Sequence, residues 1–193
     1  FVWTIANGTC ADSKDTVQVT VQPATIPGTI SSSATVCATA NSGTLVLAGY
    51  TGSILNWESS ADNGNTWNHI ATTGNSYTYT NLNSSTIFRA LVQNGVCNSL
   101  YSNTVTITVL PAVTNANAGP DQTLCYTTST SLSANSSSSG TGSWSALPGN
   151  PSLCSFVNNA AANTIVNGLI PGVYQFVWTI ANGTCADSKD TVQ

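Results

Sequence analysis

Residues 176–193 read FVWTIANGTCADSKDTVQ, and the same eighteen residues open the chain at positions 1–18. From Tyr174 to Ile180 large apolar residues alternate with smaller or polar ones, as they do on a strand with one buried face. The Asn-Gly pair that follows tolerates the positive φ values of a tight turn and favours a hairpin into a second strand. Because no window shows helical periodicity with helix-forming residues, the predicted fold class is all-β.

The recurrence of this stretch at an offset of 175 residues indicates a tandem array. A weaker repeat of about 88 residues lies inside that period and divides it into two related domains, which we name A and B. The pairs of residues that this weaker repeat relates are Pro23 and Pro111, Cys37 and Cys125, Trp57 and Trp144, and Cys97 and Cys185.

The repeat also predicts the domain boundaries. Residues 1–22 are expected to be the C-terminal strands of a preceding B-type domain, residues 23–110 domain A, and residues 111–193 domain B. Domain B then lacks the Val-Thr-Val-Gln that follows the first copy at Val19–Gln22, so its last strand is expected to be truncated. Proline restricts the chain at each predicted junction, which leaves almost no linker and favours an extended rod.

Each unit has the features of an immunoglobulin-like β-sandwich: some seven short strands in about 88 residues, a tryptophan in the middle, and cysteines near both ends. In domain B, Pro171-Gly172-Val173-Tyr174 resembles the turn that carries a tyrosine corner. Domain A has Phe88 near this position, so the corresponding hydrogen bond is expected to be absent there. The predicted architecture is a series of immunoglobulin-like sandwiches arranged end to end.

Composition excludes several classes of partner. Only 5% of the residues are charged and the net charge is −4, with Lys14, Arg89 and Lys189 as the cations. Three separated cations make no basic patch, so we expect neither nucleic-acid binding nor a polybasic membrane contact. No apolar run approaches the ~20 residues that span a bilayer, so membrane insertion is not expected.

The six cysteines indicate disulfides and an oxidising compartment, because the chain has no CxxC motif and a single histidine. If the two halves are homologous, Cys37 pairs with Cys97 and Cys125 pairs with Cys185. Each bridge would close a loop of about 60 residues and stabilise its domain by roughly 4 kcal/mol. Cys10 would have its partner in an upstream domain.

Cys154 is then left over in each period. One interpretation is a buried free thiol. The alternatives are a Cys125–Cys154 bond or a covalent bond to a neighbouring chain.

Residues 60–67, SADNGNTW, match the S-x-D-x-G-x-T-W Asp-box of sialidases. In that motif the aspartate bonds turn amides, the glycine permits the turn and the tryptophan packs beneath it, so its role is structural. The residues of this predicted hairpin are Ser60, Asp62, Gly64, Thr66 and Trp67.

We expect no catalytic residues and no enzyme. A sialidase needs several arginines to hold its substrate carboxylate, and this chain has one. Glycosidases need two carboxylates across a cleft, whereas Glu58 and Asp62 are expected at a solvated hairpin end. His69 has no evident nucleophile and is expected on the surface.

No cofactor is predicted, and calcium is the remaining metal alternative. Asp62, Asn63 and Asn65 in one hairpin, or Asp121 at the domain junction, offer oxygen ligands without a dense set of carboxylates. A separate alternative is a carbohydrate-binding module. Its stacking platforms would come from exposed aromatic rings, with Trp67, Tyr77, Tyr79 and Tyr101 as the candidates.

Two sets of motifs carry a family resemblance over essentially the whole chain. Domain A, with TVCA at 35–38, NWESSADNGNTW at 56–67 and SNTVTITV at 102–109, resembles immunoglobulin-like repeats of very large Bacteroidota surface proteins. Domain B, with ANAGPDQTLC at 116–125, GTGSW at 140–144 and WTIANGTC at 178–185, resembles the PKD-like repeats of the same proteins. The likeness is to gliding-motility adhesins and related filamentous proteins exported by type IX secretion.

That resemblance implies a non-catalytic, structural segment of a secreted cell-surface adhesin, in which the repeats form a stalk or filament. It also implies O-glycosylation at an Asp-Ser/Thr-apolar motif, which Thr16 and Thr191 satisfy. The expected partners are neighbouring repeats of the same chain. Other copies packed side by side into a fibre, or surface glycans, are the remaining possibilities, since exposed sheet edges favour lateral association.

Overall fold

A computed structural model describes residues 1–38 and 40–193, and its regular elements are all β-strands. No helix in the described part of the chain is long and apolar enough to cross a membrane. The strands are β1 (Val2–Ile5), β2 (Ser13–Thr16), β3 (Ile26–Ser31), β4 (Ala34–Cys37), β5 (Ser42–Thr51), β6 (Ser53–Ser60), β7 (Asn68–Ile70), β8 (Ser76–Thr80), β9 (Thr86–Gln93), β10 (Leu100–Tyr101), β11 (Val105–Leu110), β12 (Ser129–Ser133), β13 (Thr141–Ala146), β14 (Ser155–Phe156), β15 (Asn163–Asn167), β16 (Phe176–Ala181) and β17 (Ser188–Val192).

Domain A is a sandwich of two sheets. One sheet has the order β3-β5-β8, and the other has the order β4-β11-β9-β6-β7 with β10 paired to β9. Alternate residues of β9 face inward, so Phe88, Ala90 and Val92 are buried as their spacing predicts. Trp57 lies at the centre of this core and donates its indole N–H to Gly74 O at 2.9 Å.

Domain B repeats this plan with a core of its own, between the sheets β12-β15-β14 and β13-β16-β17. Trp144 takes the place of Trp57 and donates to Ala162 O at 3.1 Å. Tyr174 forms the predicted corner, because its hydroxyl accepts a hydrogen bond from Ile170 N at 2.9 Å. All-β tandem immunoglobulin-like sandwiches are therefore the fold of the chain.

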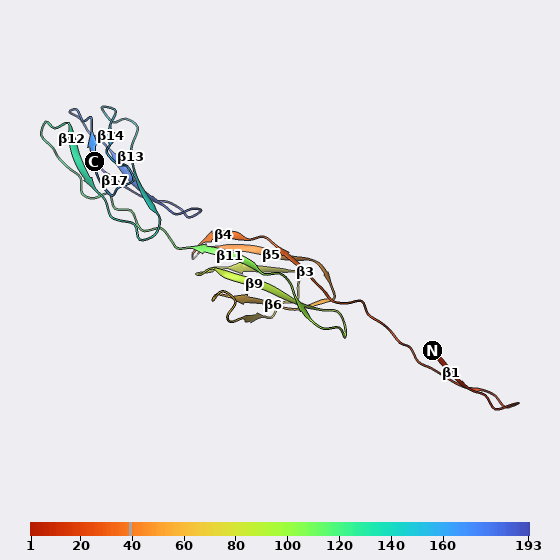
Figure 1. Cartoon of the computed structure of the whole chain (residues 1–193). Helices are drawn as coiled ribbons and strands as arrows, with labels where there is room; N and C mark the ends of the chain where they lie inside the picture. The colour runs from red at the N-terminus through yellow and green to blue at the C-terminus, as the bar shows by residue number, and fades with distance from the viewer. Residues whose placement is uncertain (39) are drawn as a thin grey trace.

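The first copy of the repeated stretch stands apart from both sandwiches. Strands β1 and β2 form a two-stranded hairpin, every residue of which is exposed. In Figure 1 this hairpin, domain A and domain B follow one another along an extended molecule.

One strand prediction fails in this segment. The alternation over Thr16–Val21 predicts a strand, but β2 ends at Thr16 and the next strand begins at Ile26. In domain A the equivalent residues form β11, which is held between β4 and β9. Val17 still exchanges backbone hydrogen bonds with Phe1. Residues 18–22 have no backbone partner in the described part of the chain, so the pairing that would make them a strand is missing.

Candidate functional site: the junction between domains A and B

The two sandwiches meet with almost no linker. Strand β11 ends at Leu110, and the next residue, Pro111, already belongs to domain B. There the turn between β16 and β17 reaches back, and Asn182 Nδ2 donates to Pro111 O at 2.8 Å. A Cβ added at Gly183, where φ is +59°, would lie 2.8 Å from Leu110 Cδ1. A glycine at this position therefore lets the turn of domain B lie against the end of domain A.

A disulfide closes this junction. Cys37, the last residue of β4 in domain A, is bonded to Cys185, which follows the turn in domain B, and their Cα atoms lie 5.3 Å apart. Thr184 Oγ1 donates to Thr35 O at 3.5 Å beside the bond. The two domains are therefore joined covalently twice, through the backbone at Pro111 and through these sulfurs.

This bond corrects the predicted pairing of Cys37 with Cys97 and of Cys125 with Cys185. Cys37 lies level with Leu110 at the end of domain A from which the chain leaves, which we call the distal end. Strand β9 runs antiparallel to β11, so the turn after it carries Cys97 to the opposite, proximal end. There Cys97 Sγ lies 3.4 Å from Pro23 O. The length of the sandwich separates the two sulfurs, and no in-domain bond can form.

The sequence itself indicates which end of domain A each cysteine reaches. Cys37 lies fourteen positions after Pro23, and at about 3.3 Å per residue this length is enough to cross a domain from one end to the other. Cys97 directly follows an Asn-Gly turn after the strand that returns. The predicted in-domain pairing rests on homology between the two halves and takes no account of this length.

The remaining cysteines are unbonded in the described part of the chain. Cys10 and Cys125 are exposed, and Cys97 is half-buried. Cys154 is half-buried and packs against the core of domain B, with its Sγ 3.6 Å from Ser152 O. The structure therefore does not form the Cys125–Cys154 bond that we considered.

The Asp-box residues close the turn between β6 and β7. Asp62 accepts hydrogen bonds from Thr66 Oγ1, from Thr66 N at 2.9 Å and from Ser60 Oγ at 2.7 Å. These bonds, those from Thr66 first, lower the pKa of Asp62 to about 2. Both carboxylate oxygens are thus engaged within the turn itself, which agrees with a structural role.

The candidate stacking aromatics do not form a common platform. Tyr79 is buried in the core of domain A, and Tyr77 packs against that core. The guanidinium of Arg89 lies between the rings of Trp67 and Tyr101, 3.7 Å from each centroid, and so covers one face of each ring.

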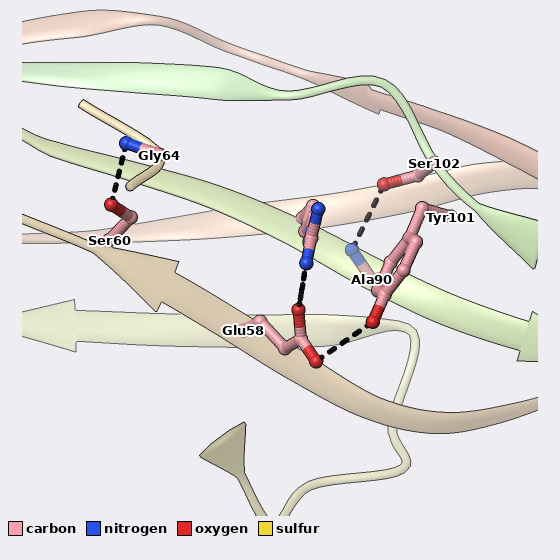
Figure 2. A network of polar contacts seen from close by, with 7 residues as sticks. Glu58, Ser60, Gly64, Ala90, Tyr101 and Ser102 are labelled. Atoms are coloured by element: carbon pink, nitrogen blue, oxygen red, sulfur yellow. Dashed lines mark hydrogen bonds and ion pairs between the residues drawn. The ribbon is translucent and has the colours of Figure 1, made fainter. Parts of the chain in front are cut away.

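Glu58 completes this group, which sequence reasoning missed because the cation and its partners are distant in the chain. Its carboxylate is 2.7 Å from Arg89 Nη2 and accepts from the Tyr101 hydroxyl at 3.1 Å, the contact drawn in Figure 2. Arg89, whose charge could otherwise bind an anion, is neutralised and stacked. The group therefore holds together the outer surface of one sheet of domain A.

The other candidate residues are dispersed. His69 is exposed on β7, and Asp121 accepts a hydrogen bond from Gln193 N at 2.8 Å. The described residues contain no cluster of three or more histidine, cysteine or acidic side chains placed to hold a metal ion. Thr16 and Thr191, the predicted O-glycosylation positions, are both exposed.

One protein-family model matches part of the chain. Residues 26–111 match a family model described as a domain of unknown function, DUF8696. No curated protein matches the chain.

Solved structures resemble the chain as a whole. Extracellular domains 3–5 of Drosophila OTK share 14% identity with a TM-score of 0.52, over 98% of this chain and 68% of that chain. A marsupial T cell receptor shares 16% identity with a TM-score of 0.48, over 83% of this chain and 69% of that one. Fibronectin(III)-like modules of Clostridium thermocellum CbhA share 14% with a TM-score of 0.38, over 85% and 90%. At 14% identity the likeness to the OTK domains supports the tandem sandwich fold alone.

Proposed function

We propose that the chain is a structural, non-catalytic repeat segment of a stalk or filament outside the cell, within a bacterial surface adhesin of the type exported by type IX secretion in Bacteroidota. The observation that carries the proposal is the Cys37–Cys185 disulfide, which bonds one sandwich to the next across a junction without a linker. A structure that only presents separate binding modules has no need of such a bond.

The disulfide changes how the molecule carries tension. Force that enters domain A at its proximal end reaches Cys37 and passes directly to Cys185 in domain B. The chain between the two cysteines, which are 148 positions apart in the sequence, is excluded from that path. At about 3.5 Å per extended residue, the bond keeps roughly 500 Å of chain from being drawn out. A stalk that anchors a cell under flow benefits directly from this restraint.

The surface chemistry agrees with a role outside the cell. Ser, Thr, Asn and Gly take the places of charged side chains, of which the chain has only 5%. Interactions that depend little on charge are also insensitive to salt. A disulfide at the junction requires an oxidising compartment to form and persist.

Immuno-electron microscopy of the producing cells tests this function. Antibodies raised against the 193-residue chain should label thin threads that project from the cell surface, and cells that lack the protein should lose both label and threads. Thick bundles would favour lateral assembly into a fibre. Label confined to the cell interior, or to dispersed secreted protein, would contradict the proposal.

A further inference from the structure

We propose that the Cys37–Cys185 disulfide is one member of a series, and that Cys125 is bonded to Cys97 of the following repeat. Every junction of the array would then carry one disulfide. The inference rests on the tandem array in the proposed function, and it does not depend on adhesion.

The turn that carries Cys97 repeats the junction turn of domain B. Asn94 Nδ2 donates to Pro23 O at 2.8 Å, as Asn182 Nδ2 does to Pro111 O. The backbone N–H of Cys97 donates to Asn94 O at 3.0 Å, and Cys185 N donates to Asn182 O at the same distance. Domain A therefore presents its cysteine toward the preceding domain in the pose that Cys185 has in the formed disulfide.

The contact with the preceding strand is also repeated. Gly95 has a φ of +54°, and a Cβ there would collide with the side chain of Gln22. Gly183 makes the same approach to Leu110. Gln22 and Leu110 both directly precede the junction proline. The proximal face of domain A thus already contacts the segment that precedes it, and Cys97 there has no disulfide partner.

In the 88-residue repeat of the sequence, Cys125 of domain B corresponds to Cys37 of domain A. In domain A, β4 pairs in parallel with β11, and this pairing sets Cys37 level with Leu110. In domain B the same pairing has begun, because Gln122 N donates to Gln193 O at 2.8 Å. Continued by four residues, this pairing would bring Cys125 to the distal end beside the next junction.

The space for those four residues is present. A cavity of about 970 Å³ lies beside the end of β17, between residues 121–128 and residues 169–174, with Val192 and Gln193 in its lining. In domain A the end of β11 fills this position. Val19–Gln22 follow the first copy of the repeat, so the same Val-Thr-Val-Gln after Gln193 would fill the cavity and complete the ladder.

The chemistry is ordinary oxidation of two thiols. Cys125 and Cys97 each lose one hydrogen as the S–S bond forms. The two electrons and two protons pass to the disulfide of a thiol–disulfide oxidoreductase, which becomes a dithiol. Both sulfurs are unbonded and neither is fully buried, so that enzyme has access to them.

A tandem protein tests the proposal: residues 1–193 followed directly by residues 19–193, which extends the array by one seamless period. It is secreted into an oxidising compartment, isolated as a monomer, and digested without reduction for mass spectrometry. With Cys97→Ser in the first copy and Cys125→Ser in the second, a peptide that joins Cys125 to Cys97 can arise only from the new junction. We expect this peptide, and we expect the single-period chain to leave Cys97 and Cys125 open to alkylation.

The controls separate this bond from other pairings. Cys154→Ser should leave the Cys125–Cys97 peptide unchanged, and Cys125→Ser should abolish it while Cys37–Cys185 persists. A Cys125–Cys154 peptide, or alkylation of both cysteines in the folded tandem, would overturn the proposal. If the tandem misfolds, the same digest of the full-length protein decides the question. The outcome is independent of where antibodies label the cell, so the proposed function and this inference fail separately.

Discussion

The same eighteen residues occur twice in this molecule, once exposed and once inside a sandwich, and they form the same hairpin. In the first copy Trp3 pairs with Asp15 and Ile5 with Ser13; in the second Trp178 pairs with Asp190, and the register is identical. The surroundings differ completely. Trp3 is 72% exposed, whereas Trp178 is 1% exposed.

This comparison separates two contributions to the fold. Strand pairing and the Asn-Gly turn are encoded locally, because they appear without any neighbour. Burial is supplied by the rest of domain B, and an isolated two-stranded hairpin is marginally stable at best in water. Substitutions made in parallel in the two copies therefore measure what the sandwich adds, at constant local sequence.

The largest difference is expected for tryptophan. Trp178→Ala should lower the free energy of unfolding of domain B by about 3–5 kcal/mol, because it opens a cavity in the core beside Trp144. Trp3→Ala should change it by less than about 0.5 kcal/mol. Urea denaturation followed by circular dichroism measures both. Equal effects would mean that the first hairpin is packed against the sandwiches in solution.

The second largest difference between the two copies is expected for their cysteines. Cys185→Ser removes the junction disulfide and should cost about 2–4 kcal/mol, with a larger maximum extension when the chain is pulled from its two ends. Cys10→Ser, in the same local sequence, should alter neither quantity, because Cys10 is unbonded. Denaturation and single-molecule extension without reductant provide the two readouts. A Cys185→Ser protein that extends no further than the parent would contradict the claim that the disulfide keeps the chain between Cys37 and Cys185 out of the path of tension.

A smaller difference is expected for the paired aspartates. Asp190 Oδ2 accepts a hydrogen bond from the N–H of buried Ala118 at 2.8 Å, whereas Asp15 Oδ1 accepts one from the N–H of its exposed neighbour Thr16. Asp190→Ala leaves that N–H without a partner and should cost about 1–3 kcal/mol. Asp15→Ala should be near neutral. Thermal unfolding of the two variants measures both losses of stability. A larger loss for Asp15→Ala than for Asp190→Ala would show that strand pairing within the hairpin, and not the hydrogen bond to Ala118, sets the loss.

The smallest effect concerns a turn that, like the first hairpin, is held by its own residues. The folded pKa of Asp62 is about 2, below its usual 3.8. The stabilisation that the ionised carboxylate of Asp62 gives to the folded state is therefore present above pH 4, and it is lost as the pH falls from about 4 to about 2. Asp62→Asn should remove this part of the pH dependence and leave stability at pH 7 only slightly changed. Denaturation of both proteins between pH 2 and pH 5 measures it; identical pH profiles would contradict the assigned bonds.

These cases also show how far sequence reasoning reaches. The corner at Tyr174 was predicted, and the alternation that buries Phe88, Ala90 and Val92 can be read from the sequence, because periodicity and turn chemistry are local. The disulfide partner of Cys37 was not, because pairing depends on which end of a sandwich each strand reaches. The stacking of Arg89 between Trp67 and Tyr101 depends likewise on strands that are neighbours only after folding.

The central claim is that the two sandwiches are bonded to each other and not each to itself. Digestion of the unreduced 193-residue chain, with free thiols alkylated beforehand and the peptides identified by mass spectrometry, tests it most directly. The structure predicts a peptide that joins Cys37 to Cys185, and alkylation of Cys97. A peptide that joins Cys37 to Cys97 would contradict it.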